Sequence, residues 1–128
     1  MWKWGLLFVT IYDLRFPEII RDLGLQGIQV LHIVAEWPLA RETHWNILLR
    51  ARAIENQMYV VASNIAGTQL GVEFAGSSQI VDPWRDVVQK LDQEVGELKA
   101  TLDLEKVPQI RKEVPLFDSR VPEKYRKL

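Results

Sequence analysis

The chain has 128 residues, of which 48% are hydrophobic and 26% charged, a composition typical of one globular domain and not of a disordered or collagenous protein. Its 16 basic and 17 acidic residues leave a formal charge of -1, so we expect no electrostatic attraction to nucleic acid or to an anionic membrane. The sequence contains no run of about 20 apolar residues, so it predicts no membrane-spanning helix. The lack of Cys excludes disulfides, zinc–thiolate sites and a thiol nucleophile from these residues, and it favours a cytoplasmic location.

The N-terminal part begins with a short apolar run. Residues 6–12 are rich in β-branched and aromatic side chains, which predicts a buried strand. A Lys precedes the run, as in a signal peptide, but no small-residue cleavage site follows. Pro17 and Glu18 then suit the first turn of a helix, because proline loses no hydrogen bond there and an acid faces the positive end of the helix dipole. This helix is expected to end near Gly24 or Gly27.

The rest of the chain alternates between further strands and helices. Residues 28–35 are almost continuously apolar, which predicts a strand buried on both faces. Residues 39–57 carry apolar side chains at spacings of three and four, which predicts a long helix. Strands are expected at 58–64, 74–81, 86–91 and 97–102, and a short helix at 105–112 precedes a tail interrupted by proline. This order predicts an α/β fold in one domain.

A series of motifs runs along the chain from Tyr12 to Tyr125. They are Tyr12-Asp-Leu-Arg-Phe-Pro-Glu18, Ala35-Glu-Trp-Pro38 with Arg41 and His44-Trp45, Ala51-Arg-Ala-Ile-Glu-Asn-Gln57, Asn64, Phe74-Ala-Gly-Ser-Ser78 and Asp82-Pro-Trp84. In order and spacing they closely resemble the carbon–nitrogen hydrolase (nitrilase) superfamily, and above all its omega-amidase branch. The resemblance covers the C-terminal half of the family's usual chain. It implies that residues 1–128 form a partial domain, the C-terminal half of an α-β-β-α sandwich.

The resemblance also implies a chemistry. Members of the superfamily hydrolyse a C–N bond through a cysteine thioester, with a Glu as general base and a Lys that stabilises the oxyanion. Such a trio suits an amide, which is a poor electrophile. The resemblance places the Cys directly before Tyr12, where this chain has Ile11, and places the Glu and Lys in the N-terminal half. It therefore predicts part of an amidase for a small omega-amide, inactive alone, with no metal and no cofactor.

The resemblance stops abruptly upstream of Tyr12, and the genetic code offers an explanation. Codons chosen for residues 1–11 and read one base forward give Leu-Ile-Ile-Cys before Tyr-Asp, which restores a strand and a nucleophile. A seven-base tandem repeat at the codons of Ile11 to Arg15 would cause this shift. We therefore expect residues 1–11 to be translated out of frame, with a diverged pseudoenzyme as the alternative. A gene without a direct repeat at these codons would exclude the frameshift.

The resemblance assigns roles to several residues near the nucleophile position. Tyr12, Asp13 and Arg15 would brace its turn, and the alternative is an ordinary ion pair at a strand end. Glu36 and Trp37, on a nearby loop, would line the substrate pocket or merely pack. Arg41 and His44 could add positive charge to the pocket, although His44 is more simply explained as a helix residue that bonds locally.

A second group of residues is expected to support the site. Arg52 and Glu55 have the i,i+3 spacing of an ion pair, and with Asn56 they would form helical scaffold near a subunit interface, the alternative being a solvated pair. Asn64, at a strand end, would be part of the scaffold or pocket wall.

Two positions depart from the family pattern. Ser77 stands where members commonly have His, which weakens the expectation of a preserved hydrogen-bond network. Arg85 stands where Gly is common, which suggests a changed turn after Asp82.

The expected partners follow from the missing half. Half a sandwich leaves apolar surface in water, at a cost of about 25 cal/mol per Å². We therefore expect self-association or binding to an N-terminal half, through the helix that begins at Pro17 and the helix over 39–57. A noncatalytic interaction subunit and one half of a split amidase are the alternative functions.

Overall fold

The computed structural model describes residues 5–9 and 12–126, and it describes side chains from Tyr12 onward. Its main sheet has the strand order β1-β2-β3-β6-β7. The first three of these strands are parallel, and the last two are antiparallel to their neighbours. The strands are β1 (Gly5–Val9), β2 (Val30–Ala35), β3 (Tyr59–Asn64), β6 (Gln79–Val81) and β7 (Val87–Lys90).

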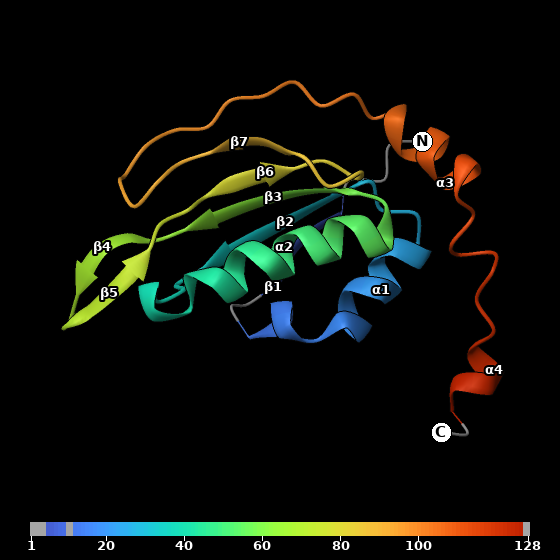
Figure 1. Cartoon of the computed structure of the whole chain (residues 1–128), viewed down its shortest axis with the longest axis horizontal. Helices are drawn as coiled ribbons and strands as arrows, with labels where there is room; N and C mark the ends of the chain where they lie inside the picture. The colour runs from blue at the N-terminus through green and yellow to red at the C-terminus, as the bar shows by residue number, and fades with distance from the viewer. Residues whose placement is uncertain (1–4, 10–11, 127–128) are drawn as a thin grey trace.

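Two helices cover one face of this sheet (Figure 1). They are α1 (Pro17–Leu25) and α2 (Glu42–Asn56), each preceded by a short 3-10 turn, η1 (Asp13–Arg15) and η2 (Leu39–Arg41). The segment after β7 crosses the molecule on the opposite side of the sheet and leads to α3 (Lys106–Glu113) and α4 (Pro122–Tyr125) (Figure 1). The mixed α/β fold is therefore confirmed.

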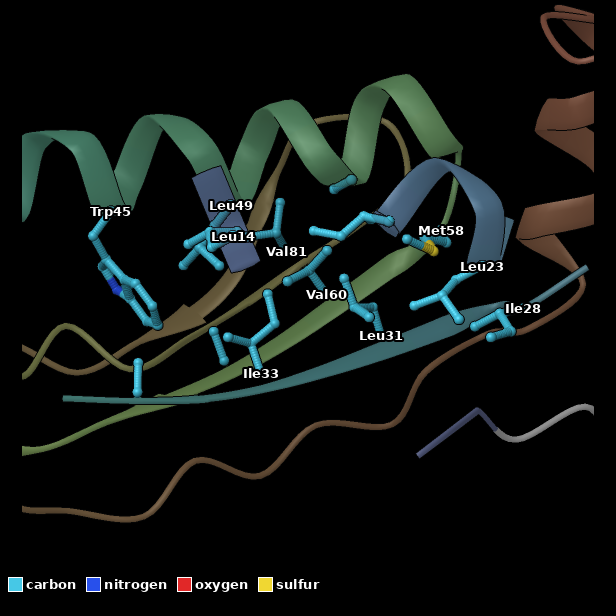
Figure 2. Packing of buried hydrophobic residues seen from close by; sticks show 14 of the residues in the cluster. Leu14, Leu23, Ile28, Leu31, Ile33, Trp45, Leu49, Met58, Val60 and Val81 are labelled. Atoms are coloured by element: carbon cyan, nitrogen blue, oxygen red, sulfur yellow. The ribbon is translucent and has the colours of Figure 1, made fainter. Parts of the chain in front are cut away.

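The main core lies between α2 and the sheet (Figure 2). Trp45, Leu49 and Ala53 follow one another at intervals of four along α2, and all three are fully buried. They belong to the same cluster as Leu31 of β2 and Val60 of β3. Full burial of a Leu or Val side chain, such as Leu49 or Val60, stabilises the fold by about 1.5–3 kcal/mol. The helical spacing in the sequence thus predicts the buried face of α2 correctly.

The opposite face of the sheet is covered only in part. Val30 and Tyr59 are buried there against Val107 of α3. Toward the carboxyl end of β2, however, Val34 is 52% exposed. The expectation that residues 28–35 are buried on both faces is therefore wrong for this end of the strand, because no described segment packs over it.

The predicted strand at 74–81 is wrong as a single element. The chain forms β5 (Val72–Ala75) and β6, which belong to different sheets. Gly76 and Ser77 separate them with φ angles of 57° and 51°, in the left-handed region that favours glycine. At Gly76 a Cβ would also lie only 2.7 Å from the carbonyl oxygen of Asp92, so this bend requires glycine.

β5 pairs with a strand that the sequence analysis missed, β4 (Ala66–Gln69). Leu70 and Gly71 form the two-residue loop between them, both with positive φ, as hairpins of type I′ require. An exposed Leu at a left-handed position is an unusual loop residue, which explains why no hairpin was predicted here.

The predicted strand at 97–102 is also wrong. The segment has no regular structure, and only Leu98 and Leu102 are even partly buried. The N–H of Lys99 donates to the side chain of Gln89 and not to a neighbouring strand's backbone. Too little apolar surface is available here to hold a strand against the sheet.

The other elements differ from the prediction at their ends. β1 ends at Val9, and Tyr12 has helical angles and lies directly before the turn η1, so the strand expected at 6–12 is shorter. The helix expected at 39–57 is split between η2 and α2, and it ends at Gln57, whose φ is 49°. Gly24 lies inside α1 and packs against Asn56, while the chain turns at Gly27.

Arg85 adopts a backbone conformation that suits glycine. Its φ is 144°, and such angles cost a residue with a Cβ about 1–3 kcal/mol. We expect Arg85→Gly to raise the free energy of unfolding by about 1 kcal/mol, measured by urea denaturation. Arg85→Ala, which removes the side chain and keeps the Cβ, is the control and should give no such gain. Equal stabilisation by both variants would contradict backbone strain.

Asp82 organises the turn after β6. One of its carboxylate oxygens accepts hydrogen bonds from the N–H groups of Trp84, Arg85 and Asp86 at 2.8–2.9 Å, and the other accepts a bond from Nζ of Lys106 on α3. Burial raises the pKa of Asp82, but the bond from Lys106 and the backbone N–H groups outweigh it, so the pKa lies below its ordinary value. The same contact raises the pKa of Lys106.

These shifts give the turn a defined pH dependence. A lowered carboxyl pKa contributes stability above the ordinary value of about 3.9, and this contribution is lost as the pH falls through the lowered pKa. Asp82→Asn should therefore cost about 2 kcal/mol at pH 7 and progressively less toward pH 2, measured by urea denaturation across this range. Asp118→Asn, at an exposed carboxylate, is the control. A loss for Asp82→Asn that does not depend on pH would contradict the charged pair.

Candidate active site

Three segments meet where the parallel strands end. Ligands in open α/β sheets bind in the crevice outside the carboxyl ends of parallel strands. The chain after β1 continues into the turn η1, β2 leads to Glu36 and Trp37, and β3 ends at Asn64. Most of the residues that the sequence assigns to the site therefore gather at one edge of the sheet.

Asn64 fixes the loop that carries Trp37. Its side-chain oxygen accepts the backbone N–H of Trp37 at 2.6 Å, and its side-chain nitrogen donates to the carbonyl oxygens of Trp37 at 3.2 Å and Gly76 at 2.8 Å. The indole of Trp37 is 1% exposed, and its N–H donates to the carbonyl oxygen of Arg41 at 2.6 Å. The loop after β2 and the start of α2 are thereby held together.

A hollow of about 460 Å³ lies beside this loop. The guanidinium of Arg15 stacks on the ring of Trp37, 4.7 Å from its centroid, and its Nη1 lies 3.5 Å from Nδ1 of His44. The lining residues come from η1, the loop after β2, η2 and the first turn of α2; they are Tyr12, Arg15, Trp37, Pro38, Arg41 and His44.

The structure separates the two residues expected to form the pocket. Trp37 lines the hollow, whereas Glu36 is exposed and does not. Neighbouring side chains of an extended segment point to opposite sides, so Glu36 faces outward when Trp37 faces inward. His44 lines the hollow as well, which the simpler explanation of a locally bonded helix residue had missed. Asp13 shares the turn of Arg15 but is not a lining residue.

Arg52 of α2 forms hydrogen bonds to the turn η1. It is 5% exposed, and its Nε and Nη2 donate to the carbonyl oxygen of Leu14 at 3.1 and 2.8 Å. Nη1 forms the expected ion pair with Glu55 at 2.9 Å. A solvated ion pair is therefore the wrong description of Arg52. Asn56 is buried and donates to the carbonyl oxygen of Arg52, which fixes the end of the helix.

Ser77 belongs to a polar network at the start of α2. Its hydroxyl donates to the carboxylate of Glu42, and its carbonyl oxygen accepts the indole N–H of Trp45 at 2.9 Å. The side chain of Gln79 donates to Asn46 at 2.8 Å. The sequence analysis missed Glu42, Asn46 and Gln79. The spacing of four between Glu42 and Asn46, beside the apolar stripe of α2, was the available signal.

Ile11, where the family resemblance places the nucleophile, lies outside the described residues. Within residues 5–9 and 12–126, no three His, Cys, Asp or Glu side chains are grouped closely enough to hold a metal ion. Over the same residues, no helix combines the length and the hydropathy needed to cross a bilayer.

Comparison with known proteins agrees with this arrangement. Residues 4–112 match the sequence profile of the carbon–nitrogen hydrolase family. The hydrolase in the agr operon of Staphylococcus lugdunensis is 44% identical over 115 residues, which cover 90% of this chain and 49% of that protein. The 2-oxoglutaramate amidase of Bacillus subtilis (strain 168) is 49% identical over 107 residues, or 84% of this chain and 41% of that protein.

A solved structure shows the same fold. The C. elegans NitFhit protein superposes with a TM-score of 0.88 and 38% identity, over 94% of this chain and 30% of that one. The chain spans about half the length, or less, of the proteins that it matches. By sequence and by structure, the chain belongs to the carbon–nitrogen hydrolase (nitrilase) family.

Proposed function

We propose that this chain supplies the C-terminal part of an amidase site that acts on a small omega-amide such as 2-oxoglutaramate. The observation that carries the proposal is the hollow between Tyr12, Trp37 and Arg41, at the edge where the parallel strands end. Tyr12 is covalently joined to position 11, so the hollow begins one residue from the place where the family resemblance puts the nucleophile. The name of the Bacillus subtilis relative supports this substrate class.

The chemistry proposed for the whole site is acyl transfer. A cysteine thiolate attacks the amide carbon, the C–N bond breaks with release of ammonia, and water hydrolyses the thioester. The residues of this chain would hold the attacking group in place: Arg52 ties the turn η1 to α2, and Asn64 ties the loop of Trp37 to Gly76. Such positioning accounts for a large part of catalysis.

The 128-residue polypeptide by itself is proposed to be inactive, because it contains no Cys. The resemblance also places the general base and the oxyanion cation in the N-terminal half of the family's chain. The same half would cover the exposed end of β2 around Val34.

The purified chain should therefore release no ammonia from 2-oxoglutaramate, because a site that lacks its nucleophile retains at most weak catalysis. A coupled ammonia assay measures this, with the substrate in buffer as the blank. Ile11→Cys alone should not restore the reaction, since neither the base nor the cation returns. Ammonia release that stays with the chain through further purification would contradict the proposal.

A further inference from the structure

A second hollow, of about 320 Å³, lies at the C-terminal end of α2, whereas the candidate active site lies at the first turn of that helix. We call it the α2–α3 hollow, because its lining comes from the end of α2, the turn after β6, α3 and the segment that follows α3. Two of the eight lining residues, Gln57 and Arg85, are polar. The other six are apolar; they are Ile54, Pro83, Trp84, Ile110, Val114 and Leu116. Mostly apolar walls with a few polar groups are usual in small-molecule sites.

Hydrogen bonds fix the walls of the α2–α3 hollow. Asp82 orders the turn after β6 through three backbone N–H groups, and its second carboxylate oxygen accepts Nζ of Lys106 on α3. Gln57 is 3% exposed, and its side-chain nitrogen donates to the carbonyl oxygen of Val114 at 2.8 Å. The turn, α3 and the segment after it are thereby held without help from a ligand, which lowers the cost of binding one.

The α2–α3 hollow leaves large apolar side chains in water. Ile54, Trp84, Val114 and Leu116 come from three different segments of its lining, and each is between 37% and 46% exposed. Apolar surface that converges on one hollow favours an apolar group of a ligand, because its removal from water is favourable.

Arg85 adds a positive charge that the fold hardly uses. Its side chain is 72% exposed, and its one ion pair among the described residues joins it to the equally exposed Asp86 at 4.0 Å, so this pair contributes little stability. No Asp or Glu lines the hollow. The φ of 144° at Arg85 is strained for any residue with a Cβ, and strain of this kind is often found at binding sites. The guanidinium is therefore available to an anionic ligand.

We propose that the α2–α3 hollow binds a small carboxylate with an apolar tail, with the carboxylate at Arg85 and the tail along Ile54 and Trp84. The planar guanidinium matches a carboxylate in shape and charge. A neutral apolar ligand would leave this charge unused, and a small hydrophilic anion would leave the apolar walls in water. The hollow shares no lining residue with the candidate active site, so the inference does not depend on the proposed function.

Binding of three probes to the 128-residue chain tests the inference. Hexanoate carries a carboxylate and a tail, hexanamide carries the same tail without the charge, and acetate carries the charge without the tail. Each is titrated into the isotope-labelled chain, and NMR shifts are followed at the indole N–H of Trp84 and the side-chain amide of Gln57. Hexanoate should bind with a Kd on the order of 1 mM, about tenfold more tightly than hexanamide. Acetate at the same concentration should cause no shift.

Arg85→Gln should abolish the preference for hexanoate and leave the binding of hexanamide nearly unchanged. Lys99→Gln is the matched control, because Lys99 is also an exposed cation, paired with Glu97 at 3.4 Å, and it does not line the hollow. This control should bind as the unmodified chain does. Arg85→Gly, which is expected to stabilise the fold, should lose the preference too, so the loss cannot be attributed to unfolding.

Several results would overturn the inference. Equal affinity for hexanoate and hexanamide contradicts a role for the charge, and a preference that survives in Arg85→Gln contradicts the assignment of Arg85. Titrations that shift neither Trp84 nor Gln57 contradict the site itself. Shifts at the indole N–H of Trp37 alone would place hexanoate in the hollow beside Trp37 and not in the α2–α3 hollow.

Discussion

Replacement of Arg52 by Met is expected to lower the free energy of unfolding by about 3 kcal/mol. Arg52 gives two hydrogen bonds to the carbonyl oxygen of Leu14 and one to Glu55. Leu14 is fully buried, so its carbonyl would be left without a donor, which costs about 1–3 kcal/mol. Glu55 is 34% exposed and recovers part of its loss in water, so the cost stays below that of a fully buried pair.

Urea denaturation of two further variants makes this prediction specific. Arg50→Met removes an exposed Arg from the same helix and should change stability by no more than about 0.5 kcal/mol. Arg52→Lys keeps the charge but has no planar fork, so it should recover only part of the loss. A cost below 1 kcal/mol for Arg52→Met would show that the turn η1 is held by its apolar contacts and not by Arg52.

Replacement of Asn64 by Leu should also cost about 3 kcal/mol. The shape of the side chain is nearly kept, but the N–H of Trp37 loses its acceptor and the carbonyl of Gly76 loses its donor. Each buried group left unpaired costs about 1–3 kcal/mol. The backbone groups of Asn64 keep their bonds to the hydroxyl of Ser78, so β3 itself should persist.

Ser63→Ala, at an exposed neighbour on β3, is the control and should be nearly neutral. Asn64→Asp is the more informative variant, because it can still accept from Trp37 but cannot donate to Gly76. At neutral pH its ionised carboxylate would face the carbonyl oxygens of Trp37 and Gly76, so Asn64→Asp should be at least as destabilising as Asn64→Leu. It should recover stability at acid pH, where the protonated carboxyl group can donate a hydrogen bond. Equal stability of Asn64→Leu and Ser63→Ala would contradict the role of Asn64 in fixing the Trp37 loop.

The sequence predicted the parts of the fold that depend on local patterns. The spacing of Trp45, Leu49 and Ala53 identified the buried face of α2, and the apolar run at 28–35 identified β2. The bend at Gly76 was missed, because it is imposed by the approach of the backbone at Asp92, which lies 16 positions further along the chain. The prediction of a strand at 97–102 failed for the same reason, since a strand needs a neighbouring strand to pair with and the local sequence does not specify one.

The candidate site also contains residues that local motifs predicted and residues that only the packed fold brings together. The resemblance to carbon–nitrogen hydrolases pointed to Trp37, and the structure places it in the hollow. Arg41 stood in the same motif, but its position depends on the indole of Trp37 and on the turn η2. The contact between Glu42 and Ser77 joins residues 35 positions apart. Pairings over such distances follow from the packed fold and not from the spacing of residue types.

A chimera shows whether residues 12–128 form a competent half of an amidase site. The N-terminal part of the Bacillus subtilis 2-oxoglutaramate amidase, through the residue aligned with Ile11, is joined to residues 12–128 of this chain. Ammonia release from 2-oxoglutaramate is measured for the chimera and for the same chimera with Ala at the junction residue. We expect release by the first protein and none by the second. A folded chimera that carries the nucleophile and releases no ammonia would contradict the claim.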